Sequence, residues 1–309
     1  MELWKRSFDD TDAFVRLFFT HVYRKENALY IEQGGRIVSA LQMLPYTLQF
    51  YGMEIPVSYI YGACTHPEER GKGWMSALIQ KAFKVMAERH IALTVIIPAE
   101  KSLFDYYRRF GYTEAFDYAT ETILPLQTTV CEDTDITVAS VDASQQESLF
   151  HYFDRKQRER SCYVLHNQKD FATLLLESKQ SGGQVLTAVR KSNNQPVGML
   201  FCYPVDNRIE IREGFYDTPV VREQLLQAAL RQYPAEKAFC RIPPTPSTPS
   251  HPLGMARIID RDRLIRHWLT AHPDTHHTLE ELQHMNASSL THLLLGYVRK
   301  EAYMSLMLD

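Results

Sequence analysis

The chain has 309 residues, of which 45% are hydrophobic and 23% are charged, and its formal net charge is -3 at pH 7. This length predicts a globular protein of about two domains, and the weak negative charge without a long basic run argues against a nucleic-acid partner. Five scattered cysteines without a CxxC pair argue against a disulfide framework, and the lack of a secretion signal or of a long apolar run favours a cytoplasmic protein without a membrane partner.

The first part of the chain, residues 1–125, has the pattern of one α/β unit. In chain order the periodicity predicts a helix (9–23), four strands (28–33, 36–44, 46–52 and 55–65), a helix (73–89), a strand (91–99), a short helix (103–110) and further strands from residue 111. Pro45 separates two of these strands. The continuously apolar run at 55–65 is typical of a strand in the middle of a sheet.

A second unit, residues 130–243, repeats this theme more weakly. Its predicted elements are two helices (144–157 and 169–178), three strands (184–191, 196–204 and 208–217), a helix (221–233) and a strand (238–243). Five prolines in residues 243–252 exclude a helix and favour an extended linker. The remainder predicts a strand, a long helix and an apolar tail. We therefore expect three parts, at 1–125, 130–243 and 244–309, of which the last is too small to fold alone.

The step between the strand at 55–65 and the helix at 73–89 contains Gly71 and Gly73. It fits neither a P-loop, which requires GxxxxGK followed by Ser or Thr, nor a dinucleotide fingerprint, because Ser76 stands where the third glycine is needed. Glycines at a helix start nevertheless let the backbone approach a ligand and turn its N–H groups toward an anion. The alternative is a tight surface turn without a ligand.

Two motifs in register give this region a resemblance to the GCN5-related N-acetyltransferase (GNAT) superfamily. The acetyl-CoA loop of that superfamily, R/Q-x-x-G-x-G/A, is matched by Arg70-Gly71-Lys72-Gly73-Trp74-Met75 except at its last position, and "FDYYRRFGY" resembles the later FYxxxGF segment. The resemblance implies a GNAT fold of the α/β (α+β) class, with a mixed, mostly antiparallel, splayed sheet flanked by helices. It also implies a second, degenerate GNAT-like domain, because the second unit lacks the Arg-Gly-Lys-Gly run.

The three-part organisation is similar to the enhanced intracellular survival (Eis) type of acetyltransferase. That type ends in a sterol-carrier-protein-like domain, and "SSLTHLLLGYV" looks like a shortened form of it.

The resemblance implies acetyl-CoA as cosubstrate and direct attack on its thioester by a small-molecule or peptide amine. It implies Tyr107 as the general acid that protonates the leaving thiolate, with Tyr106 as the alternative, and the C-terminal carboxylate of Asp309 as a group that reaches the active site. The residues implied to bind the cosubstrate are Ala63, Cys64, Thr65, Arg70, Gly71, Lys72, Gly73, Trp74, Met75 and Ser102.

Several alternatives remain open at this point. Tyr107 could be an ordinary half-buried aromatic, and Asp309 a frayed terminus. Six histidines between 267 and 292 suggest a metal site, but their spacing favours a solvated connection, so no metal is expected. A non-catalytic acyl-CoA-binding or sensing protein is the main rival function, and a lipid or scaffold role of the tail is a weaker one. The sequence leaves a homo-oligomer open and does not identify the acceptor.

Overall fold

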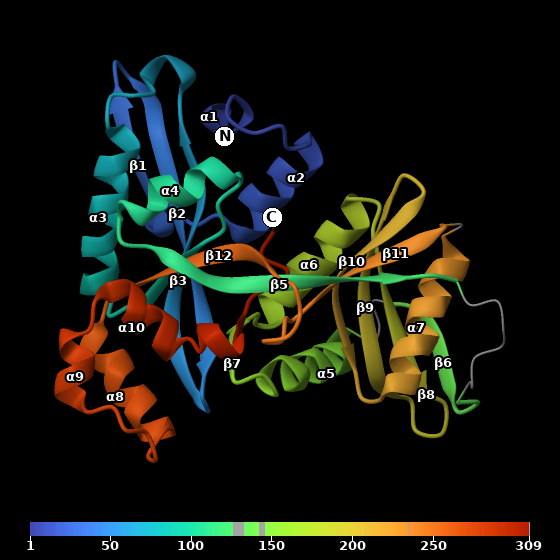
Figure 1. Ribbon diagram of the computed structural model, residues 1–309. Helices are drawn as coiled ribbons and strands as arrows, with labels where there is room; N and C mark the ends of the chain where they lie inside the picture. Colours follow the sequence, from blue (N-terminus) through green and yellow to red (C-terminus); the bar gives the residue numbers. More distant parts are fainter. Residues whose placement is uncertain (126–132, 142–145, 234, 309) are drawn as a thin grey trace. The chain divides into compact units, whose positions relative to one another are not determined.

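Each of the two units of the chain is built on a mixed β-sheet in the computed structural model, which describes residues 1–125, 133–141, 146–233 and 235–308 (Figure 1). The first unit comprises Met1–Asp117, Ser161–Leu165 and Pro252–Met304, and the second comprises Tyr118–Arg160, His166–His251 and Ser305–Asp309. The first unit thus takes in most of the segment that the sequence pattern set apart at its C-terminal end.

The sheet of the first unit has the order β13-β7-β2-β3-β4-β12-β5, and β1 also pairs with β2. The pairs β1–β2, β2–β3, β2–β7 and β4–β12 are antiparallel, and the pairs β3–β4 and β7–β13 are parallel. The strands are β1 (Ala28–Gln33), β2 (Arg36–Phe50), β3 (Met53–Thr65), β4 (Leu93–Ile96), β5 (Thr113–Ile123), β7 (Cys162–Leu165), β12 (His251–Ile258) and β13 (Ala302–Tyr303).

The helices of the first unit lie before, between and after these strands in the chain. They are α1 (Glu2–Lys5), α2 (Asp12–Leu17), the π-helix η1 (Phe18–Val22), the 3-10 turns η2 (Lys25–Asn27), η3 (Pro67–Glu69) and η5 (Tyr297–Arg299), α3 (Trp74–Glu88), α4 (Lys101–Arg108), α8 (Arg261–Ala271), α9 (Leu279–His284) and α10 (Ala287–Leu294). The apolar stripe of α3, drawn in teal in Figure 1, buries Leu78, Ile79, Ala82 and Met86 together with residues of β2, β3 and α4.

The second unit contains the end of β5 and a sheet in the order β5-β11-β10-β9-β8-β6. Only the β10–β11 pair is parallel among the strands described there. Its further elements are β6 (Ile136–Ser140), α5 (Gln146–Arg158), α6 (Gln168–Gln180), β8 (Gln184–Arg190), β9 (Gln195–Val205), β10 (Arg208–Tyr216), α7 (Pro219–Gln232) and β11 (Lys237–Ile242). The core between α7 and the sheet is aliphatic and includes Leu225, Leu226 and Ile209.

The predicted fold class is confirmed: the chain has a mixed, mostly antiparallel sheet flanked by helices. The prediction that Pro45 ends a strand is wrong, because β2 runs through it. The pairs with β1 end at Gln42 and those with β7 begin at Thr47, so none of the described strands pairs with this side of β2 at Pro45. A missing amide hydrogen is tolerated at such an edge-like position.

The helix predicted at 9–23 is only partly correct. The side chain of Thr11 accepts a hydrogen bond from the backbone N–H of Phe14 and so caps α2, which begins at Asp12. From Phe18 the helix continues as a π-helical turn, which the apolar spacing does not distinguish from an α-helix. The short strands β6 and β7 have no counterpart among the predicted elements.

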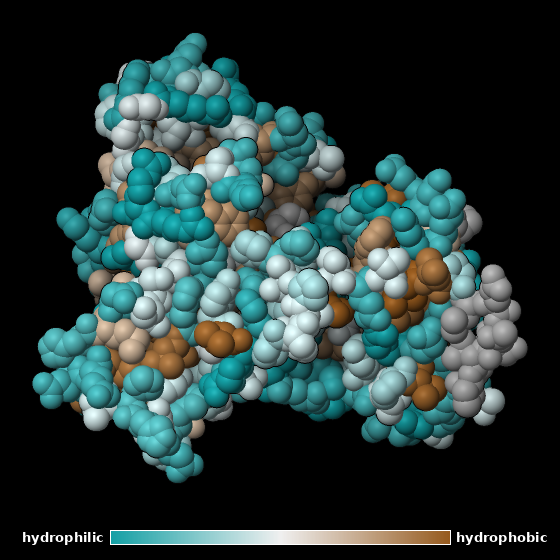
Figure 2. Space-filling view, in the orientation of Figure 1, coloured by the Kyte–Doolittle hydropathy of each residue, from teal (hydrophilic) through white to brown (hydrophobic). Residues whose placement is uncertain are grey.

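Buried apolar side chains fill both units, and polar ones cover the surface. On the face drawn in Figure 2, hydrophilic side chains predominate and hydrophobic atoms form separate patches. Large exposed hydrophobic residues are dispersed along the sequence, Val298 being the most exposed. Within the described part of the chain, no helix combines the length and the apolar character needed to cross a bilayer.

Candidate functional site

The loop between β3 and α3 brings a series of backbone N–H groups to one point. Gly71 and Gly73 have φ angles of +78° and +82°, a region that side chains rarely adopt. Gly73 is also the N-cap of α3, and it offers no side chain to accept the first N–H groups of the helix. This glycine pattern therefore leaves the start of a 15-residue helix uncapped.

Among the described residues, no partner accepts a hydrogen bond from the backbone N–H of residues 71–76, whereas the next one, of Ala77, already donates to the carbonyl of Gly73 at 3.0 Å. The helix dipole adds partial positive charge at the same point. Consecutive free N–H groups at such an end form an anion site, and they match the bridging phosphates of a nucleotide-type ligand.

Glu69 holds this loop from inside. Its carboxylate accepts hydrogen bonds from Lys72 Nζ at 2.9 Å and from Trp74 Nε1 at 3.3 Å, and Arg36 lies 3.7 Å away. The hydrogen bond from Lys72, followed by that from Trp74, lowers the pKa of Glu69, so the carboxylate is charged at neutral pH. The side chain of Arg70 ties the loop to the strand by donating from Nε to the carbonyl of Thr65 at 3.3 Å.

The parallel strands β3 and β4 separate before β3 reaches this loop. Their pairing covers only Val57–Leu93, Ser58–Thr94 and Tyr59–Val95, whereas β3 continues to Thr65. The edge of β3 that faces away from β2 is therefore without a β4 partner beyond Tyr59. An extended ligand can add to such an edge as an additional strand, and Ala63, Cys64 and Thr65 all lie along it.

A bulge at Gly62 lies in the unpaired part of β3. Ala40 pairs with Cys64 and Gln42 pairs with Tyr61, so β3 has two residues where β2 has one. Gly62 takes the extra position with φ +57°, and a Cβ there would lie 2.3 Å from the Trp4 ring. Glycine is thus required both by the backbone and by the close approach of Trp4.

Tyr107 on α4 lies in the core cluster that also holds Ile60 and Ile96, the first residues after the last β3–β4 pair. It is 6% exposed, and its hydroxyl has no hydrogen-bond partner among the described residues. Burial, and to a lesser extent the neighbouring Tyr106, raise its pKa well above the usual range, so the phenol stays protonated at neutral pH. A protonated hydroxyl near the strand opening can serve as a proton donor.

Tyr106 is directed to a different place. Its hydroxyl lies 3.4 Å from Ser76 Oγ in the first turn of α3, and Arg109 stacks over its ring at 5.0 Å. Where β3 and β4 are still paired, the Tyr112 hydroxyl shares a hydrogen bond of 3.1 Å with the Thr94 hydroxyl. Thr94 in turn donates to the Ser58 carbonyl at 2.9 Å. The two neighbouring tyrosines of α4 therefore have separate environments.

The remaining candidate residues differ in what the structure shows of them. Burial raises the pKa of the Cys64 thiol to about 11, which argues against a nucleophilic thiolate. Met75 is partly buried against the core under α3, and Ser102 is exposed with its hydroxyl donating to Glu100 at 2.6 Å. Asp309 lies outside the described residues. Within those that are described, no group of three His, Cys, Asp or Glu side chains is arranged to hold a metal ion.

Comparison with known families identifies the part of the chain that carries this geometry. Residues 1–115 match the family described as "Acetyltransferase (GNAT) domain". Residues 1–115 therefore resemble a GNAT domain. The predicted resemblance is thereby confirmed for the unit that contains the uncapped loop and the open strand edge. No curated protein sequence gives a significant match to the chain.

Solved structures extend the similarity in fold beyond residues 1–115. A conserved protein of unknown function and probable N-acyltransferase from Enterococcus faecalis V583 aligns over 85% of this chain and 70% of its own, with 19% identity and a TM-score of 0.69. Eis1 from Mycobacterium abscessus aligns over 84% and 75%, with 14% identity and a TM-score of 0.62. Saccharomyces cerevisiae N-myristoyltransferase, solved with bound myristoyl-CoA, aligns over 77% and 68%, with 11% identity and a TM-score of 0.51.

The family match supports acyl transfer in general terms, whereas the solved structures support the fold alone. Three structural features of the site were missed by sequence reasoning, namely the bulge at Gly62, its cover by Trp4 and the position of Glu69. Gly62 carried a usable signal, because an isolated glycine inside an apolar strand suggests a bulge. Trp4 and Glu69 carried none, since their partners are set by the fold.

Proposed function

We propose that this protein is an acetyl-CoA-dependent N-acetyltransferase whose working site lies in the GNAT domain. The observation that supports this most strongly is the run of backbone N–H groups at residues 71–76. These groups have no partner among the residues that the structure describes, and they lie in the loop that follows the open edge of β3. The pyrophosphate of the cosubstrate would accept from these groups, with Arg70 and Lys72 contributing positive charge. The pantetheine would extend along the β3 edge from Thr65 toward the bulge.

The chain's own residues then define the chemistry near the bulge. A neutral amine attacks the thioester carbon directly, so a C–N bond forms as the C–S bond breaks, and the β3 backbone near Cys64 would stabilise the oxyanion. Tyr107 would donate its proton to the departing thiolate, a role for which burial keeps it protonated. The attacking nitrogen must lose one proton, and the net products are an amide and free CoA.

The experiment that tests this proposal is thiol release from acetyl-CoA in the presence of a panel of small amines and peptides. Amine-dependent release that needs the intact loop supports the transferase. Tight acetyl-CoA binding without release on any acceptor would instead favour the acyl-CoA-sensing alternative, and an absence of binding would refute both. Whether the carboxylate of Asp309 takes part stays a prediction, tested by comparing the chain with a variant that ends four residues earlier.

A further inference from the structure

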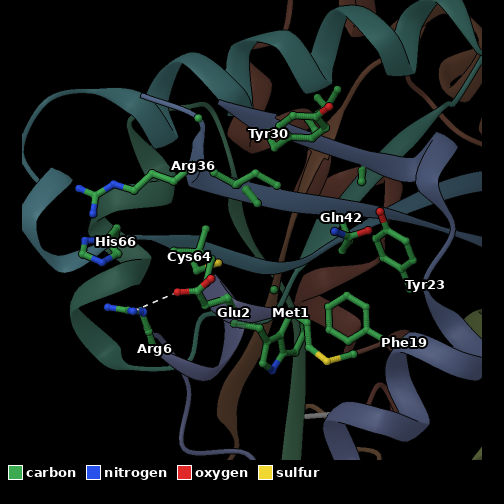
Figure 3. Close-up of a pocket in the computed structure, with 18 residues that line it drawn as sticks. Met1, Glu2, Arg6, Phe19, Tyr23, Tyr30, Arg36, Gln42, Cys64 and His66 are labelled. Atoms are coloured by element: carbon green, nitrogen blue, oxygen red, sulfur yellow. Dashed lines mark hydrogen bonds and ion pairs between the residues drawn. The ribbon is translucent and has the colours of Figure 1, made fainter. Parts of the chain in front are cut away.

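A cavity of about 360 Å³ lies in the first unit beside the bulge of β3 (Figure 3). Figure 3 shows Arg36 and His66 at one end of this cavity, Gln42 at the other, and Cys64 between them. Because Cys64 and Gly62 belong to the strand along which the pantetheine is proposed to lie, this cavity is part of the transferase site. Another cavity lies in the second unit and has no role in that reaction.

The cavity of the second unit has a volume of about 290 Å³ and lies on the face of the sheet that points away from α7. Alternate residues of β10 and β11, such as Ile209 and Ala238, are packed in the core under α7. The side chains between them point to the opposite face, since successive residues of a strand alternate. The side chains that line the cavity come from β10, β11 and β5, and they include Arg208, Glu210, Arg212, Phe239, Arg241 and Tyr118.

Two cations lie next to each other at one end of this cavity. Arg208 and Lys237 are partners in the register of β10 and β11. Both lie over the Phe239 ring, at 5.6 and 5.1 Å from its centroid. Arg208 contacts Glu210 at 3.0 Å, an ion pair of small value because the side chains are 41% and 37% exposed. Lys237 has no hydrogen-bond or ion-pair partner among the described residues, so this end has one unpaired ammonium group.

A third cation lies at the other end of the cavity. Arg212 stacks over the Tyr203 ring at 4.0 Å, and Tyr203 is the register partner of Glu210, so Arg212 lies on the same face as Glu210. The Glu177 carboxylate is 3.8 Å from Arg212, which is beyond hydrogen-bond distance, and it accepts instead from the Tyr203 hydroxyl at 2.8 Å. In the described part of the chain, no acceptor therefore uses the N–H groups of this guanidinium.

The positions of these cations indicate the shape of a ligand. A guanidinium that is stacked on a ring keeps its N–H edge available for a planar carboxylate. Lys237 and Arg212 are separated by four residue steps along the paired strands, which corresponds to about 13 Å. In an extended peptide, the side chains at positions i, i+2 and i+4 point to one side and span the same length. Two acidic residues four positions apart therefore match the two ends of the cavity.

We propose that this face of the second unit binds an extended acidic segment of a partner protein, with two acidic residues four positions apart and a large apolar residue midway between them. The first carboxylate accepts from Lys237 and Arg208, and the second accepts from Arg212. The apolar side chain enters the cavity beside Phe239. The inference goes beyond the proposed transferase function and does not rest on it.

A single-stranded nucleic acid is the other polyanion that could meet these cations. Such ligands bind mainly by stacking their bases on exposed aromatic rings. Here Arg208 and Lys237 already cover Phe239, and Arg212 covers Tyr203. The acidic peptide is favoured because it uses the charged groups and needs no uncovered ring.

The test is calorimetric titration of the intact chain with acetylated and amidated pentapeptides. The probe is Glu-Ser-Phe-Ser-Glu, and the controls are its isomer Glu-Glu-Phe-Ser-Ser and the cationic Lys-Ser-Phe-Ser-Lys. We expect the probe to bind at least about fivefold more tightly than the isomer, as two contacts between partly exposed charges allow. Binding of the probe should weaken between about 0.05 M and 0.5 M salt. The cationic peptide should not bind.

Variants of single charges distinguish a binding role from a structural one. Lys237→Gln and Arg212→Gln should each remove most of the preference for the probe over its isomer. Lys191→Gln, which removes an exposed charge in the turn between β8 and β9, should bind as the parent chain does. Glu210→Gln should tighten binding about twofold to threefold, because the carboxylate of Glu210 competes with the ligand for Arg208. A merely structural role of Glu210 would not increase affinity.

Equal binding of the probe and its isomer, or an unchanged preference in both Lys237→Gln and Arg212→Gln, would overturn the inference. Undetectable binding of the probe would overturn it as well. Tighter binding of a short oligothymidylate than of the probe would show that the face serves a nucleic acid instead. None of these results affects the transferase proposal, because thiol release from acetyl-CoA is measured without the peptide.

Discussion

The corner between β3 and α3 in the first unit differs from the corner between β10 and α7 in the second, although the two units share a local plan. In each, a strand with a bulge is followed by a helix and then by a parallel partner strand. In the second unit β10 has Arg212 as its extra residue, and the β10–β11 pairs end at Ile211 while β10 continues to Tyr216.

The two helix starts are treated in opposite ways. The side chain of Thr218 caps α7 by accepting from the N–H of Val221, and Pro219 in the first turn has no N–H to offer. Beside the bulge, Glu213 is buried and accepts from both guanidinium nitrogens of Arg160 at 3.1 Å and from the Ser305 hydroxyl at 2.5 Å. The second corner is thus closed by the chain's own groups, whereas the first is open.

The contrast indicates that the shared order of strand, helix and strand does not by itself create a binding site. What distinguishes the first corner is the set of unpaired backbone N–H groups at the start of α3. The predictions below are ways to break or to sharpen this contrast, from the largest expected effect to the smallest.

Tyr107 has no counterpart in the described part of the second unit, since no helix is described between β11 and β12. Replacing it by Phe should lower kcat by about 100-fold to 10,000-fold, the usual contribution of a general acid. The acetyl-CoA dissociation constant should remain within about twofold. The thermal midpoint should not fall, because the hydroxyl has no hydrogen-bond partner among the described residues. Steady-state kinetics of Tyr107→Phe and Tyr106→Phe measures this effect. An equal loss of kcat in the two variants would contradict the assignment of Tyr107 as the general acid.

Gly62→Ala should destabilise the chain by about 3 kcal/mol, because the new Cβ meets the Trp4 ring as well as a φ of +57°. Gly52→Ala is the matched control, since Gly52 has a φ of +86° but no atom within 4 Å of the added Cβ. The control should cost only about 1–2 kcal/mol. Chemical denaturation compares the two, and equal costs would show that Trp4 does not hold the bulge.

Gly73→Ala should weaken acetyl-CoA binding by about tenfold, because left-handed backbone costs other residues about 1–2 kcal/mol and the loop can relax only by turning its N–H groups. There is open space around the added Cβ, so steric exclusion does not contribute. Gly52→Ala again controls for the change in stability. If calorimetric titration shows that both variants bind acetyl-CoA with equal affinity, the loop at residues 71–76 does not hold the pyrophosphate.

Thr218→Ala tests the closed corner. Loss of the cap should cost about 1 kcal/mol of unfolding free energy. Because the second corner binds no cosubstrate in this account, acetyl-CoA affinity should not change. A measurable loss of affinity in the titration would mean that the second corner contributes to binding.

The smallest effect concerns the pH dependence of the loop. The hydrogen bonds from Lys72 and Trp74 lower the pKa of Glu69 in the folded state. The stabilisation that these hydrogen bonds give the folded state is therefore complete above the pKa of Glu69 in the unfolded chain, about 4.3. It is lost as the pH falls through the lower pKa of Glu69 in the folded chain. We expect a change in Trp74 fluorescence below about pH 4 that Glu69→Gln lacks. If the parent chain and Glu69→Gln give the same fluorescence change on acidification, the ionised Glu69 carboxylate does not hold the loop.

Much of the first unit could be predicted from periodicity and two motifs. The helix α3 and the strand β3 were placed within two residues at each end, because their apolar patterns are long and unambiguous. The loop could be located from its glycines, because glycine is the residue that most readily adopts a left-handed backbone. Arg36, Gln42 and His66 could not be connected with one another, since only strand register brings them to one cavity.

The boundaries of the two units were the feature hardest to predict from the sequence. Residues 252–304 cluster with the first unit, and β12 pairs with β4 through Met255 to Ile258. A proline-rich stretch before a short remainder suggests a separate segment, but pairing across about 160 residues of sequence leaves no local signal. The Pro45 error has the same origin, because tolerance of proline depends on which side of the strand lacks a partner.

The central claim, that one corner binds the cosubstrate and the other does not, is tested most directly by the stoichiometry of acetyl-CoA binding to the intact chain. Calorimetric titration should give one acetyl-CoA per chain, with the same value in Thr218→Ala and a weaker affinity in Gly73→Ala. A stoichiometry of two, or no binding at all, would contradict the account.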